Sequence, residues 1–370
     1  MVVRETDEQR ALRETVAVFL DKRSPQARVR ELMATGSGHD EGVWRDMAEM
    51  GLLGLTVPEE FGGAGAGYVE LGIVMEEMGR ALLCAPYFST AVLTTQLLAA
   101  AGDSREQAQM WPRIAAGEIV ASLAFAEDSS TRPPVRVDTS AAAIDGQWSL
   151  TGQKTFVLDA GAADLLYVLA DTDAGPSVFA VDTSASGITI AALATVDLTR
   201  KQYRVEFIDV PARQVGTPGA GVEVFTAALD HSAVALLSEQ AGGAHQAMQM
   251  GVDYARTRMQ FGRAIGSFQA VKHLCADMLL EAESAISAAR HVAAVFDEGA
   301  ESRWADLALA QAYCSDAYVF NAATTIQVHG GIGFTWEHPA HLYLRRARTD
   351  AQLLGPPSYH RDRYLQLKGA

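Results

Sequence analysis

The feature that most constrains the fold is a change of pattern along the chain. Up to about residue 118, and again from residue 216, apolar residues recur at helical spacing. Between these blocks, short runs such as "LLYVLA", "SVFAVD" and "YRVEFIDV" are separated by Gly, Asp and Ser. Runs of this kind without intervening helices predict an antiparallel sheet or small barrel. We therefore expect an α+β protein with an N-terminal helical domain (1–118), a middle antiparallel β domain (119–215) and a C-terminal four-helix bundle (216–370).

The last block contains long helices joined by short links, which predicts a bundle. The first of these helices carries one apolar face, formed by Leu237, Ala241, Ala244, Met248 and Ala255. Gly242 and Gly243 interrupt this helix, where glycine is costly. We expect the pair to mark a place where another backbone comes close.

Composition excludes several classes of protein. Hydrophobic residues make up 49% of the 370 residues and charged residues 20%, so a large core is possible and general disorder is not. The net charge of −15 argues against nucleic acid as a partner. Three cysteines without CxxC spacing predict neither a disulfide framework nor a metal site. The charged N-terminus does not resemble a signal peptide and no apolar stretch reaches the ~20 residues that span a bilayer, so we expect a soluble, cytoplasmic protein with no membrane contact.

Two motifs of the C-terminal block favour a more specific interpretation. "RTRMQFGRAIGSFQ" (Arg256–Gln269) places three arginines around Phe261 in an acidic chain, and "QVHGGIGF" (Gln327–Phe334) follows later. Taken singly, these are a helix end with solvated charges and a plain helix C-cap. Together with the order of helical and β blocks, they resemble the acyl-CoA dehydrogenase family over nearly the whole chain. "PEEFGGAGAGYVELGIVMEEMGR" fits its N-terminal domain and "LTGQKTFV" its β domain.

The resemblance implies an FAD enzyme that dehydrogenates an acyl-CoA thioester and passes electrons to an electron-transfer flavoprotein or a similar acceptor. In the family, these motifs clamp the FAD of a neighbouring subunit, which implies an oligomer. A guanidinium suits the pyrophosphate oxygens, and glycines let the main chain come close to a ligand. The residues expected to bind FAD are Arg258, Gln260, Phe261, Ile265, Phe268, Val271, Gln327, Gly330 and Gly331.

The base that removes the substrate α-proton is missing from both positions that the family uses. Leu354 occupies the position in the late loop, and Ser232 occupies the alternative position on the preceding helix. Neither residue can take up a proton as a carboxylate does. Asp230 is the nearest carboxylate, although two residues rotate it off the face of Ser232. Glu239 and Asp350 are further carboxylates, for which a structural or solvated role is the ordinary interpretation.

The side of the flavin site that a chain provides for its own cofactor also departs from the family. "FAEDSSTRPP" (Phe125–Pro134) stands where members carry a loop with hydroxyl and glycine residues. Ala126 replaces a threonine and Asp128 a proline, while Leu158 removes a second hydroxyl. Phe125, Ala126 and Phe156 are the contacts that the resemblance still implies on this side.

The losses are therefore grouped, and four interpretations stay open. The first is a supporting subunit without its own base, paired with a homologous dehydrogenase subunit in an α2β2 enzyme for bulky acyl-CoA, as in actinobacterial steroid side-chain degradation. The second is a self-sufficient homotetramer that uses Asp230 as base. The third is a related flavin monooxygenase or oxidase, which does not need the late glutamate. The fourth is a non-enzymatic scaffold, against which the retained Arg258–Gln269 segment argues.

Overall fold

The computed structural model describes residues 5–127, 131–132, 137–144 and 146–369. The chain forms two compact units. We call Met1–Val29, Tyr68–Leu83 and Ala233–Ala370 the helical unit, and Arg30–Gly67 and Cys84–Ser232 the sheet unit. Residues 1–118 contribute to both units, so this division differs from the three predicted domains. The boundaries at 118 and 215 stay a prediction, whereas the mixed α+β class is confirmed.

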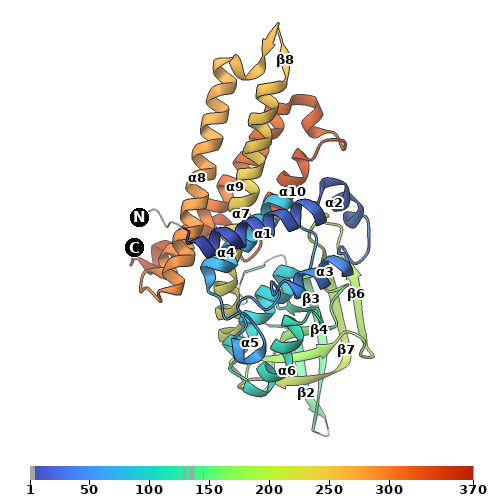
Figure 1. The fold of residues 1–370 in the computed structure, drawn as a ribbon. Helices are drawn as coiled ribbons and strands as arrows, with labels where there is room; N and C mark the ends of the chain where they lie inside the picture. The colour runs from blue at the N-terminus through green and yellow to red at the C-terminus, as the bar shows by residue number, and fades with distance from the viewer. Residues whose placement is uncertain (1–4, 128–130, 133–136, 145, 370) are drawn as a thin grey trace. The chain divides into compact units, whose positions relative to one another are not determined.

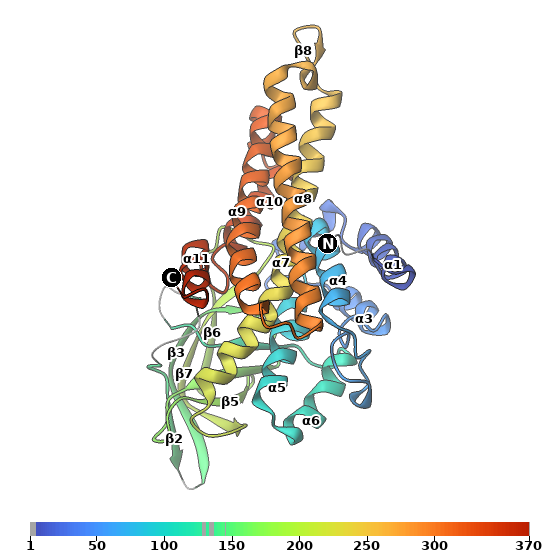
Figure 2. The ribbon, with the colours of Figure 1, turned by 90° about the vertical axis from the view of Figure 1, so that its left-hand side faces the viewer.

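The helical unit is built on long helices that lie side by side (Figures 1 and 2). Helices α7, α8 and α9 are joined by an apolar cluster that includes Met248, Met278 and Val328. A short hairpin of β8 and β9 lies at the tip of α7 and α8 (Figure 1). The elements are α1 (Asp7–Arg23), α2 (Gln26–Met33, shared with the sheet unit), α4 (Tyr68–Ala81), α7 (Gly221–Thr257, which begins in the sheet unit), β8 (Met259–Gln260), β9 (Arg263–Ala264), η3 (Ile265–Ser267), α8 (Gln269–Asp297), α9 (Arg303–His329), η4 (Gly330–Phe334), α10 (Ala340–Asp350) and α11 (Pro357–Leu367).

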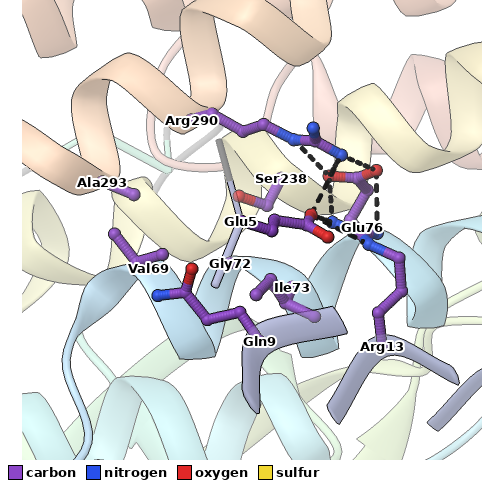
Figure 3. Close-up of a pocket in the computed structure, with 10 residues that line it drawn as sticks. All are labelled: Glu5, Gln9, Arg13, Val69, Gly72, Ile73, Glu76, Ser238, Arg290 and Ala293. Atoms are coloured by element: carbon purple, nitrogen blue, oxygen red, sulfur yellow. Dashed lines mark hydrogen bonds and ion pairs between the residues drawn. The ribbon is translucent and has the colours of Figure 1, made fainter. Parts of the chain in front are cut away.

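A network of charges ties α1 to α4 and α8 (Figure 3). Arg13 on α1 and Arg290 on α8 both bind Glu76 on α4, each with a nitrogen 3.0 Å from Oε1. Glu5 binds the same two arginines. The cavity beside this network measures about 20 Å³, which is room for about one water molecule. The network therefore attaches α1 and does not form a substrate pocket.

Helices α4 and α7 cross with their backbones almost in contact. A Cβ atom at Gly242 would lie 1.9 Å from the carbonyl oxygen of Glu76, and one at Gly79 would lie 2.0 Å from that of Glu239. The expectation that another backbone comes close at Gly242 is confirmed. At Gly243 the near neighbour is instead the ring of Tyr318, 2.4 Å from an added Cβ.

The sheet unit contains one seven-stranded sheet in the order β1-β4-β5-β7-β3-β2, with β6 also paired to β7. The prediction of an antiparallel sheet needs one correction, because β1 pairs with β4 in parallel. Parallel pairing is possible because the chain passes through the β2–β3 hairpin between these two strands. The elements are α3 (Glu41–Glu49), η1 (Glu59–Phe61), η2 (Phe88–Thr94), α5 (Thr95–Ala101), α6 (Ser104–Ala115), β1 (Ala121–Ala124), β2 (Ser140–Ile144), β3 (Gln147–Leu158), β4 (Leu165–Ala170), β5 (Ser177–Asp182), β6 (Ile188–Ala192) and β7 (Gln202–Val215).

Two kinds of feature are missing from the part of the chain that the structure describes. No helix there is long and apolar enough to cross a membrane. No group of three or more His, Cys, Asp or Glu side chains in the same residues is placed to hold a metal ion.

Adding a methyl group at Gly242 tests the crossing of α4 and α7. We expect Gly242→Ala to lower the free energy of unfolding by about 3 kcal/mol, because the Glu76 carbonyl must move away. Gly251→Ala is the matched control in the same helix, where the atoms nearest to an added Cβ are the side-chain ends of Met278 at 3.1 Å and Thr325 at 3.2 Å. Its effect should stay within about 1 kcal/mol. Equal losses in urea unfolding would contradict the close crossing.

Candidate functional site

The hairpin at the tip of α7 and α8 projects an aromatic side chain into solvent. Met259 pairs with Ala264 across it, and Phe261 and Gly262 form the turn with φ angles of 52° and 75°. Positive φ at both turn residues is the geometry of a tight two-residue hairpin. Phe261 is 90% exposed. Its left-handed backbone conformation is unfavourable for a residue with a side chain. Such strain is typical of a residue kept for contact with something outside the chain.

Basic and aromatic groups surround the base of this hairpin. The Arg263 guanidinium lies 4.0 Å from the centre of the Phe268 ring, and the rings of Phe261 and Phe268 are 6.0 Å apart. Arg258 is held by its main chain, since its N–H donates to the Tyr254 carbonyl at 2.8 Å. Its exposed guanidinium makes no hydrogen bond or ion pair with other described residues. Gln260 is exposed beside it.

The end of α9 contributes an open stretch of main chain. Gln327, Gly330 and Gly331 are exposed, and no heavy atom lies within 4 Å of a Cβ built at either glycine. Ile265 and Val271 are packed on the apolar cluster that joins this end of α9 to α7 and α8. A free guanidinium, flat apolar rings and accessible main chain suit the pyrophosphate and rings of FAD. The predicted FAD residues of both motifs therefore belong to one unit and fit this cofactor.

A stacked ring pair, half-buried at Tyr254 and buried at His329, connects the two motifs. The rings of Tyr254 and His329 are stacked with centres 4.3 Å apart, and the other neighbour of His329 is His338 at 4.2 Å. The Nδ1–H of His329 donates to the Thr325 carbonyl at 2.7 Å. Burial lowers the pKa of His329, partly opposed by this hydrogen bond, which favours the neutral form of the ring.

The two positions predicted for the base are buried and carry no carboxylate. Leu354 is 3% exposed and has a left-handed backbone, with φ of 63°. Ser232 is fully buried, and its hydroxyl donates to the Ala228 carbonyl at 2.7 Å. Asp230 is also buried, with 8% of its surface exposed. The assignment of Asp230 as a base stays a prediction.

The other two carboxylates have structural surroundings. Glu239 on α7 forms an ion pair with Arg346 on α10, and their side chains are 3% and 2% exposed. Removing one partner of such a buried pair is costly, which explains both residues without a catalytic role. Asp350 is 1% exposed at the end of α10. After α10, the ring of His360 on α11 donates to the Gly355 carbonyl at 3.0 Å and so stabilises the loop that contains Leu354. Burial lowers the pKa of His360 to about 4.

The predicted own-subunit flavin side lies in the sheet unit. Phe125 and Ala126 are buried, and the Ala126 carbonyl accepts the N–H of Thr155 at 2.8 Å. The pairing of β3 with β7 shifts register at this point, and Phe156 has φ of 53°. Such irregularities re-aim side chains and are common beside active sites. The site thus keeps an unusual backbone, but Ala126 and Leu158 supply no hydroxyl.

A buried ion pair supports this segment. Lys154 on β3 is fully buried, with Nζ 2.6 Å from Oε1 of Glu127. Burial lowers the pKa of Lys154 to about 8, although Glu127 favours its charged form. Nothing in the sequence indicates this pair, because a lysine in an alternating strand is normally expected to face solvent. Asp128, the predicted replacement for a proline, lies outside the described residues.

Comparison with known proteins agrees with this arrangement. Models of the acyl-CoA dehydrogenase N-terminal, middle and C-terminal domains match residues 6–118, 122–210 and 219–366. The acyl-CoA dehydrogenase IpdE2 of Mycobacterium tuberculosis is 36% identical over 352 residues, which cover 95% of this chain and 94% of that protein.

Solved structures are similar over the same length. The ChsE4-ChsE5 complex from Mycobacterium tuberculosis contains a chain that superimposes with a TM-score of 0.89 at 28% identity, covering 100% of this chain and 99% of that one. A variant of the Tcur3481-Tcur3483 steroid ACAD gives 0.86 at 28% identity, covering 98% of each chain. Flavin oxidoreductase activity and FAD as cofactor follow from this membership. The chain belongs to the acyl-CoA dehydrogenase family.

Proposed function

We propose that this chain is a supporting subunit of a heteromeric acyl-CoA dehydrogenase. It completes the FAD site of a homologous partner subunit with the grip, by which we mean Arg258, Gln260, Phe261, Ile265, Phe268, Val271, Gln327, Gly330 and Gly331. The partner supplies the carboxylate that removes the substrate α-proton. The observation that carries the proposal is Leu354, a buried leucine in a left-handed loop where a family base would stand.

The distribution of charge supports a role for the grip outside its own chain. Arg258 has no acidic neighbour among the described residues that binds its guanidinium, and Phe261 is almost fully exposed. In the isolated chain, these two side chains are exposed to water, where they contribute little to the stability of the fold. When FAD is bound, it supplies the hydride acceptor of the reaction, whereas the grip residues only bind and orient it. Bidentate contact with pyrophosphate is the natural task of Arg258.

The absence of a suitable base supports division of labour. The Ser232 hydroxyl donates a hydrogen bond to a helix carbonyl, and Glu239 forms an ion pair with Arg346. General base catalysis requires a carboxylate within reach of the substrate, and neither standard position offers one. A homologous subunit with that carboxylate would complete the chemistry. The relatives named for the ChsE4-ChsE5 complex and a steroid ACAD support a hetero-oligomer and a bulky, steroid-type acyl-CoA here. Electron-transfer flavoprotein or a similar carrier is the proposed acceptor.

Removing the guanidinium of the grip should weaken FAD binding. In the flavin-binding assembly, we expect Arg258→Met to raise the Kd for FAD at least tenfold, on the order of the loss of one charge-assisted hydrogen bond. Arg256→Met is the control, because Arg256 is exposed and lies 3.9 Å from Asp253. It should change the Kd by less than about threefold. Fluorescence titration measures both, and equal effects would argue that the basic charge acts without a specific contact.

The substitution Asp230→Asn distinguishes the proposed supporting subunit from a self-sufficient enzyme. In the complex with the partner subunit, Asp230→Asn should leave kcat for acyl-CoA dehydrogenation within about twofold, because the base lies elsewhere. Flavin absorbance should be unchanged, which controls for folding around this buried residue. Loss of turnover with flavin still bound would instead identify Asp230 as the base and overturn the division of labour.

A further inference from the structure

The two halves of the grip come from different helices, so their spacing has to be set by contacts between those helices. Arg258 follows α7, and Gly330 follows α9. Polar contacts connect α7 to α9 along their length: Gln240 to Ser315 at 3.0 Å, Asn321 to the Ala244 carbonyl at 3.3 Å, and Thr325 to the Ala247 carbonyl at 2.5 Å. Each buried bond would be lost by sliding one helix along the other. Together they fix the register of the pair.

The stack of Tyr254 on His329 is the contact in this series that is nearest to the grip. The Tyr254 carbonyl accepts the N–H of Arg258 at 2.8 Å, so the tyrosine is attached directly to the arginine backbone. His329 is covalently joined to Gly330. A shift of either ring therefore moves one half of the grip relative to the other.

The orientation of the histidine ring is itself fixed. Its Nδ1–H donates to the Thr325 carbonyl on its own helix, and the ring of His338 packs against it with centres 4.2 Å apart. His329 is 5% exposed. The ring has few alternative positions, which is what a spacer between two binding elements requires.

We propose that Tyr254 and His329 are positioning residues that set the distance between Arg258 and the Gly330–Gly331 main chain. The inference rests on the proposed function, since it assumes that the grip binds FAD. The ring pair acts through its two neighbours in the chain and needs no contact with the cofactor. In a preorganised site, moving a binding group by about 1 Å can lower affinity or activity by a large factor.

A double-mutant cycle on the ring pair tests this. In the flavin-binding assembly, Tyr254→Leu and His329→Leu should each raise the Kd for FAD about tenfold. The double variant should also show about tenfold, and not a hundredfold, because either change alone breaks the same stack. Tyr254→Phe keeps both rings and the His329 hydrogen bond, and should stay within about threefold of the unchanged protein.

A merely structural role would have a different signature. Thermal unfolding of the flavin-free protein measures the loss of stability. Gly242→Ala provides a loss of stability in α7 away from the rings, at the crossing with α4, and should leave the Kd for FAD within about threefold. If the leucine variants do not fold, His329→Asn removes the ring while keeping a donor for the Thr325 carbonyl, and the same tenfold loss is expected.

Two outcomes would overturn the inference while leaving the grip intact. In the first, the two leucine changes have additive effects on the Kd for FAD, or no effect, while Arg258→Met still weakens FAD binding. This result would mean that the rings do not position the grip. If Arg258→Met also binds FAD normally, the grip itself is wrong and the proposed function fails with it. The Arg258 variant therefore separates the two failures.

Discussion

The close crossing of α4 and α7 is the constraint on which the helical unit depends. Gly79 and Gly242 let the two backbones approach so closely that a single methyl group would collide with a carbonyl oxygen. The same turn of α7 carries Glu239, whose side chain is paired with Arg346 on α10. One short stretch of α7 thus fixes its position against two other helices. The polar contacts to α9, the Tyr254–His329 stack and the hairpin all follow from that position along the same helix.

The chemistry of the chain is asymmetric in a way that has a physical explanation. The proposed binding residues Arg258 and Phe261 lie exposed, whereas the positions predicted for the base are buried and carry leucine or serine. A subunit that only binds and orients a cofactor needs exposed donors and rigid helices, and it gains nothing from a buried carboxylate. The left-handed backbone at Leu354 costs about 1 kcal/mol, and under the proposed division of labour this cost has no catalytic benefit in this chain. It is consistent with a loop inherited from a base-bearing relative.

The helical blocks, the strand region and the family could be predicted from the sequence because each has a local signal. Period and turn residues reveal helices and strands, and the Arg256–Gln269 segment with Gln327–Phe334 forms a specific pair of motifs. Gly242 could be interpreted correctly because glycine inside a long helix is costly. The parallel pairing of β1 with β4 could not, since strand pairing depends on distant parts of the chain. The Lys154–Glu127 pair and the Tyr254–His329 stack were missed for the same reason, because nothing near either residue in the sequence indicates its partner.

The central claim is that this chain completes a flavin site instead of holding a flavin alone. The most direct measurement is the ratio of flavin to protein by absorbance, for the chain purified alone and together with a homologous dehydrogenase subunit. The account predicts almost no flavin for the chain alone and about one flavin per pair of chains in the complex, because the grip and the flavin-ring side then come from different subunits. One tightly bound flavin for every chain when it is purified alone would contradict the account and identify a self-sufficient enzyme.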